Sequence, residues 1–235
     1  MTEQLKFVYP WPMSQFLDKF INLFKWPIAI YMLLSLPALF ASFQFFDIKS
    51  IKTIALLIGL VFFVFSKTMM DASVRTSMQI IAHEFAHTFF ALLTFHKIKH
   101  IRLNPDDTGG EMGFVGDGNW LIIIAPYFFP LFALIYMIGM SFLPPQIIWH
   151  GILGYFLGYH IDTVGSQIHD KQTDVPKVGY KFCLMFLPGA NLWVIGSLLA
   201  FNAKSWGGIS QYIGLIWHLN LDYAHQLFQL ISAAF

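Results

Sequence analysis

Hydrophobic positions in this chain fall in long runs that only short polar stretches interrupt. The clearest run covers residues 26–46 and contains no charged side chain. Because a helix needs about 20 mostly apolar residues to cross a bilayer, this run predicts a membrane span. Similar runs predict spans at 51–66, 74–95, 120–142, 147–163 and 182–203, and a seventh at 209–235 is open because that segment carries Asp222 and His225.

The composition indicates that lipid, rather than a large internal core, covers these apolar runs. Hydrophobic residues make up 57% of the chain and charged residues 11%, against about 45–50% and about 25% in soluble domains. We therefore predict an all-α membrane protein, a bundle of six or seven transmembrane helices that forms a single integral-membrane domain over residues 1–235. The lipid bilayer is then a partner, and we expect a multi-pass protein of the cell membrane.

Charge and cysteine content exclude other classes of protein. The formal net charge is +1 and no basic block occurs, so we expect no nucleic-acid partner. The single cysteine, Cys183, excludes an intramolecular disulfide and a zinc–thiolate cluster. The sequence carries no signal for the oligomeric state.

A short segment before the first span predicts an amphipathic helix. In residues 14–25, apolar side chains such as Phe16 and Phe20 recur at helical spacing, with polar side chains between them. This pattern suits a helix that lies in the membrane interface, and it suits equally a helix docked on protein.

The stretch after the third predicted span is too polar to cross a membrane. Residues 97–118 contain two short apolar segments on either side of turn signals such as Asn104-Pro105 and Gly109-Gly110. This pattern predicts a small β-hairpin, which we place at the membrane edge.

The candidate chemistry lies inside the third predicted span, where His83, Glu84 and His87 form the pattern H-E-x-x-H. Residues four apart share one face of a helix, so both imidazoles can bind one metal, most simply Zn²⁺. Glu84 can then take a proton from metal-bound water. Ionisable side chains inside a span are costly and usually functional. We therefore predict His83 and His87 as metal ligands and Glu84 as the catalytic residue.

A catalytic zinc normally has three protein ligands, and the residues alone leave the third one open. Glu111 is the only glutamate after the motif, but it falls in the hairpin and lacks a supporting aspartate four residues on. The other candidates are Asp162, near the end of the fifth predicted span, and Asp174, between the fifth and sixth.

The order of these features resembles the site-2 protease family of intramembrane zinc metalloproteases over residues 80–201. The H-E-x-x-H helix is followed by the hairpin, then by Ala125-Pro126 at the start of the next helix, and then by a late aspartate before a further span. The resemblance implies that this stretch is the core of the active site.

The sequence departs from the usual N-x-x-P…L-D-G segment of that family. Tyr159-His160 and Thr173-Asp174 stand in its place, as in a divergent branch of the family. The resemblance implies Asp174 as the third zinc ligand, with Asp162 as the alternative.

The activity that the resemblance implies is hydrolysis of peptide bonds in membrane-embedded or membrane-proximal segments of a membrane-protein or peptide substrate. His160 and Asn191 are candidates to donate a hydrogen bond to the oxyanion, or else to bond another helix. An exposed strand edge at residues 113–115 would offer backbone groups that capture an unwound substrate.

Two other functions stay open. His96 and His100 are also four apart, and with the motif histidines they are similar to the histidine boxes of di-iron membrane lipid oxidases. Those sites need more histidines and an adjacent pair, which this chain lacks. Lys97 and Lys99 beside them favour an interfacial rim instead. The non-enzyme alternative is a non-catalytic metal-binding scaffold or a transporter on the same fold.

Overall fold

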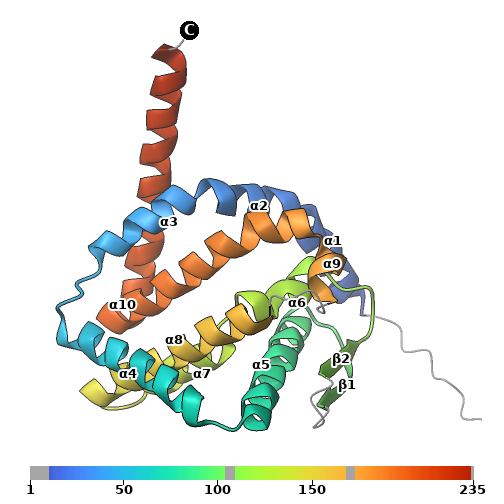
Figure 1. The fold of residues 1–235 in the computed structure, drawn as a ribbon. Coiled ribbons are helices and arrows are strands. Elements are labelled where there is room, and N and C mark those ends of the chain that lie inside the picture. The colour runs from blue at the N-terminus through green and yellow to red at the C-terminus, as the bar shows by residue number, and fades with distance from the viewer. Residues whose placement is uncertain (1–10, 104–108, 168–172, 234–235) are drawn as a thin grey trace, which may run out of the picture.

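The computed structural model describes residues 11–103, 109–167 and 173–233. Within these residues it confirms an almost wholly helical fold with one small two-stranded antiparallel sheet (Figure 1). The elements are α1 (Pro12–Leu23), α2 (Lys25–Leu34), α3 (Leu36–Ser42), η1 (Phe43–Phe45), α4 (Ile51–Met69), α5 (Ala72–Leu93), β1 (Ile98–Leu103), β2 (Gly110–Phe114), α6 (Trp120–Ile124), η2 (Ala125–Tyr127), α7 (Leu131–Met140), α8 (Ile147–Gln167), α9 (Asp174–Val178) and α10 (Tyr180–Ala233).

The predicted count of six or seven membrane spans is not confirmed. Among the described helices, α4 and α10 are long and apolar enough to cross a membrane, and the count rises to 4 if each of two bent helix pairs forms one span. One pair joins α2 to α3 and η1 with a bend of 50°, and the other joins α6 and η2 to α7 with a bend of 78°. Polar side chains interrupt the apolar sequence of α5 and α8, which is why these helices fall short.

The sixth and seventh predicted helices meet without a loop. They form the 54-residue α10, which is interrupted only at Lys204 and Ser205, where φ is −140° and 55°. The part that follows the break first packs against α3, where Tyr212 and Ile216 are buried beside Leu39, and its C-terminal end extends out of the bundle (Figure 1). The predicted end of this helix, residues 234–235, lies outside the described residues.

Helices α4 and α8 pack closely along one side of the bundle, because glycines remove the side chains between them. A Cβ atom on Gly154 would lie 1.8 Å from the backbone oxygen of Leu56, and one on Gly59 would lie 1.7 Å from that of Gly151. Small residues allow helix backbones in a membrane to approach this closely. No larger residue fits at either glycine without moving a helix.

The amphipathic helix α1 presents its polar side to the protein. Ser14 and Asp18 are buried, whereas Phe16 is 63% exposed and Phe20 52% exposed. The hydrophobic effect in water would favour the opposite orientation, since it buries apolar side chains. The location of this helix in the membrane interface stays a prediction.

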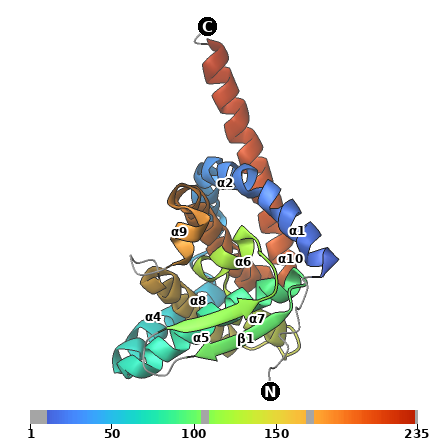
Figure 2. The same ribbon diagram turned by 90° about the vertical axis from the view of Figure 1, so that its right-hand side faces the viewer.

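The hairpin lies against α5 (Figure 2). Its antiparallel strands pair Ile98 with Phe114 and Leu103 with Gly110. The predicted turn residues 104–108 lie outside the described part of the chain. This packing brings the start of β2 beside the H-E-x-x-H residues.

An aromatic cluster fixes the short helix α9. Phe182 stacks on Phe186 with ring centroids 5.3 Å apart, and the Trp120 ring lies 5.0 Å from that of Phe182. Val175 and Val178 of α9 are buried in the same cluster. The first residue of α9 is thereby held between α6 and α10.

Candidate metal centre

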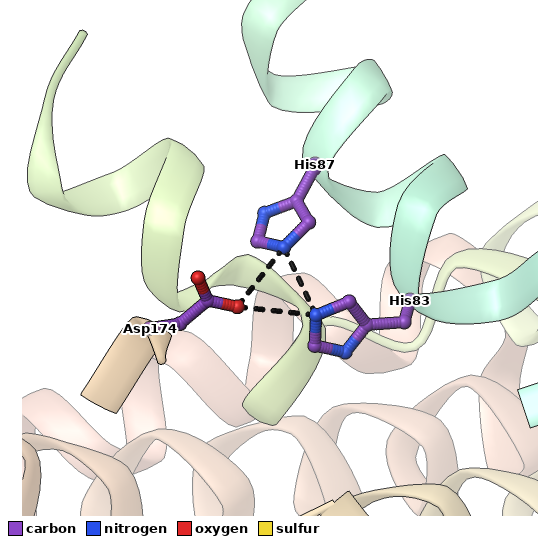
Figure 3. Close-up of side chains that lie close together, drawn as sticks. All are labelled: His83, His87 and Asp174. Atoms are coloured by element: carbon purple, nitrogen blue, oxygen red, sulfur yellow. Dashed lines mark hydrogen bonds and ion pairs between the residues drawn. The ribbon is translucent and has the colours of Figure 1, made fainter. Parts of the chain in front are cut away.

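Three side chains predicted as metal ligands meet at one point. His83 and His87 extend from α5, and Asp174 extends from the first residue of α9 (Figure 3). The two Nε2 atoms are 3.0 Å apart, and Asp174 Oδ2 lies 3.2 Å from Nε2 of His83 and 3.3 Å from that of His87. One ligand atom from each residue lies within 4.8 Å of the other two.

Helical geometry explains the two histidines, and the fold supplies the aspartate. Residues four apart lie on one face of a helix, so the rings of His83 and His87 are neighbours, with centroids 4.6 Å apart. Asp174 is 87 residues further along the chain from His87 and reaches the site only because the aromatic cluster holds α9 in place.

The surroundings of Asp174 favour the ionised form of its carboxyl group. Burial alone would raise its pKa, but hydrogen bonds from His83 and His87 outweigh that effect and hold the pKa well below its usual value. Asp174 lies outside the candidate membrane spans. Its side chain is therefore an anion at neutral pH, as a metal ligand must be.

The backbone determines which nitrogen of His87 can bind a metal. Nδ1 of His87 lies 2.7 Å from the carbonyl oxygen of Ile122. A carbonyl oxygen only accepts hydrogen bonds, so Nδ1 carries a proton and Nε2 is the nitrogen left to bind a metal. Such outer contacts are typical of metal-binding histidines.

These residues fit zinc. Imidazole nitrogens and carboxylate oxygens are its common ligands, and three protein ligands with one open position are typical of a catalytic site. All three side chains are close to nine-tenths buried, at 10%, 12% and 13% exposed. The ligand set itself stays a prediction.

Glu84 lies beside the three predicted ligands and is buried against the hairpin, with 5% of the residue exposed. A Cβ atom on Gly110 would lie 2.5 Å from Glu84 Cγ and 2.7 Å from Oε1. The first residue of β2 therefore has to be small for this carboxylate to keep its position.

Tyr127 is a further residue at the centre, and the sequence analysis did not identify it. It is fully buried in η2, its ring lies 5.5 Å from that of His83, and its hydroxyl donates to Asp174 Oδ2 over 3.4 Å. Its position directly after Ala125-Pro126 is the only signal that the sequence offers.

The competing candidates for the third ligand lie elsewhere. Asp162 forms an ion pair with Lys67 and accepts a hydrogen bond from Gln79 over 3.1 Å. Glu111 has a 60% exposed side chain and faces Arg102 across the hairpin at 3.6 Å. Neither carboxylate belongs to the group formed by His83, His87 and Asp174.

The two candidates for an oxyanion donor differ in their contacts. Asn191 donates hydrogen bonds to the backbone oxygens of Tyr127 and Leu187, each over 3.0 Å, and so links α10 to η2. His160 is buried in α8, and its Nε2 has no hydrogen-bond partner among the described residues. The prediction of an interfacial rim was wrong for His96, which is 3% exposed and lies 3.1 Å from Asp18 of α1. That partner lies 78 residues away in the sequence, so the adjacent lysines gave a misleading signal.

Comparison with known proteins supports one family. A family model described as Peptidase M50B-like matches residues 53–159. No curated protein and no solved structure matches the chain. The matched segment contains His83, Glu84 and His87 and ends before Asp174. Together with the apolar helices, it points to a membrane protein and a peptidase, and it supports membership of the chain in the site-2 protease family.

Proposed function

We propose that the chain is a zinc peptidase that hydrolyses peptide bonds in membrane-embedded or membrane-proximal segments of membrane proteins or peptides. The observation that carries this proposal is the convergence of His83, His87 and Asp174 beside the carboxylate of Glu84. The family match to residues 53–159 supports a peptidase. Location in the cell membrane with several spans is part of the same proposal.

In this mechanism His83, His87 and Asp174 would hold the metal, and Glu84 would move the protons. Bound zinc would supply Lewis-acid chemistry, which makes water acidic enough to be deprotonated near neutral pH. Glu84 removes a proton from the attacking water and then passes it to the departing amine. Burial of the carboxylate keeps it close to the reacting atoms and away from competing solvent.

The hairpin gives the proposal a way to hold substrate. Hydrolysis needs an extended segment, because a helix engages its own backbone groups. Gly110 brings β2 to within contact of Glu84, so an unwound segment added along the hairpin would lie near the general base. Removing residues 98–114 should abolish cleavage while leaving zinc bound, and unchanged cleavage would exclude this role.

The decisive experiment combines metal analysis with one substitution. The full chain is purified in lipid nanodiscs, its metal content is measured, and cleavage of a panel of end-labelled single-span peptides is followed. We expect one zinc per chain, and Glu84→Gln should keep the zinc and lower cleavage by about 10²–10⁴-fold.

The same experiment separates the alternatives. Two irons per chain would favour the di-iron lipid oxidase. Bound zinc with identical product patterns for the wild-type chain and Glu84→Gln would favour a non-catalytic scaffold or a transporter.

A further inference from the structure

A glutamine that the sequence analysis did not single out contacts the metal centre. Gln167 is the last residue of α8 and is 6% exposed. Its Oε1 lies 3.0 Å from Nδ1 of His83. An amide oxygen can accept a hydrogen bond from the N–H of a neutral imidazole, so this contact forms without a charge on either side chain.

A second hydrogen bond determines which way the amide of Gln167 points. Its Nε2 donates to the backbone oxygen of Gln79 over 3.1 Å. Because a carbonyl oxygen only accepts, the amide nitrogen must face Gln79 and the amide oxygen must face His83. Nδ1 of His83 therefore carries a proton, and Nε2, which faces Asp174 and His87, is the nitrogen left to bind a metal.

The partner of Gln167 is itself fixed. The side chain of Gln79 donates to Asp162, and Asp162 forms an ion pair with Lys67 of α4. The hydroxyl of Tyr159 donates to the backbone oxygen of Met78 over 2.7 Å, one residue before Gln79 in α5. Side chains from α4 and α8 thus hold the segment of α5 whose carbonyl orients Gln167.

We propose that Gln167 is a positioning residue that holds His83 in its metal-binding tautomer and ring orientation. The proposal rests on the metal centre of the proposed function, but not on peptide hydrolysis. Without an acceptor at Nδ1, the His83 ring is free to turn and to place a proton on Nε2. Loss of such an outer contact typically lowers metal affinity by about 10–100-fold.

Two substitutions at this position separate the hydrogen bond to His83 from the one to Gln79. Gln167→Met keeps the length of the side chain but removes both bonds. Gln167→Glu keeps an oxygen that accepts from His83 but cannot donate to the Gln79 carbonyl. Ser166→Ala is the matched control, because Ser166 is an exposed neighbour whose hydroxyl bonds only within α8 among the described contacts.

The readouts are the zinc affinity of the full chain in nanodiscs, measured by competition with a chromophoric chelator, and the visible absorption of the Co²⁺-substituted protein. We expect zinc affinity to fall about 10–100-fold in Gln167→Met, with an altered Co²⁺ spectrum. Gln167→Glu should retain most of the affinity, and Ser166→Ala all of it.

Equal zinc affinity in Gln167→Met and the control would overturn the proposal. The proposal would also be overturned if zinc affinity fell as much in Gln167→Glu as in Gln167→Met. The hydrogen bond to the Gln79 carbonyl, rather than the one from His83, would then determine zinc affinity. If Gln167→Met fails to fold, the affinity of Gln167→Glu alone decides between the two outcomes. Zinc binding without any peptide cleavage would refute the protease and leave this proposal standing.

Discussion

Two regions of this protein bury histidine beside aspartate, and only one of them forms a candidate metal centre. At the first, Nε2 atoms of His83 and His87 converge on Asp174 Oδ2. At the second, Nε2 of His96 lies 3.1 Å from Asp18 Oδ2. Both histidines of the first region and the histidine of the second are almost inaccessible to solvent, so burial does not distinguish the two regions.

The difference lies in how the remaining hydrogen-bonding atoms are used. In the second region, Nδ1 of His96 bonds Thr94 over 2.9 Å, and Asn119 donates to Asp18 Oδ1 over 2.7 Å. Each polar atom thus has its own protein partner, and α1 is fastened to the start of α6. In the first region three candidate ligand atoms, one from each side chain, face the same point, an arrangement that suits one bound cation.

Removing one histidine from each region should show most clearly which region binds metal. His87→Ala should lose bound zinc and all measurable cleavage, because two ligands do not hold a catalytic zinc. His96→Ala should keep one zinc per folded chain. Metal content of the purified proteins checks both, and loss of zinc in His96→Ala would show that the second region also binds metal.

Asp18→Ala should reduce stability rather than zinc content. The change leaves His96 and Asn119 buried without their partner, at an expected cost of about 3 kcal/mol in the free energy of unfolding. Thermal or denaturant unfolding in nanodiscs measures the effect. Unchanged stability would contradict the fastening role of α1.

Gly110→Ala tests the feature that the second region lacks, a carboxylate base held beside the ligands. The new Cβ would displace Glu84, which it would approach to 2.5 Å. Misplacement of a reacting group by about 1 Å lowers kcat by about 10²-fold, with zinc retained. Gly139→Ala is the control, since a Cβ atom at Gly139 would meet no neighbouring atom within 4 Å. Equal kcat for the two variants would show that the contact between Gly110 and Glu84 does not position the carboxylate.

The smallest effect is expected for Asp162→Asn, which sharpens the assignment of the third ligand. The Lys67 side chain of this ion pair is 34% exposed, so loss of the ion pair should lower the free energy of unfolding by about 1 kcal/mol or less. Zinc content should not change. Loss of zinc here, with zinc retained in Asp174→Asn, would reverse the assignment of the third ligand.

The sequence allowed good prediction of features that are local along the chain. The H-E-x-x-H residues share a helical turn, so His83, Glu84 and His87 could be placed together from their spacing alone. The hairpin was predicted from its turn residues, and the structure shows its two strands. Asp174 came from the family resemblance, because no spacing rule links it to α5.

Features made by tertiary contacts could not be predicted. Gln167 and Tyr127 matter only because α8 and η2 pack beside α5, and the sequence around Gln167 gives no sign of this. The predicted number of spans is not confirmed, because a hydropathy run does not show whether its helix is bent, as α6 and α7 are. The partner of His96 was hidden by its distance in the sequence.

The glycine contacts between α4 and α8 limit how a substrate can reach the site. A Cβ atom at Gly59 or Gly154 would already collide with the backbone of the opposite helix, so the two backbones are in direct contact at these positions. A membrane segment could not pass between the helices there without separating the pair. In the proposed peptidase, we therefore expect substrate to reach the site from another side of the bundle.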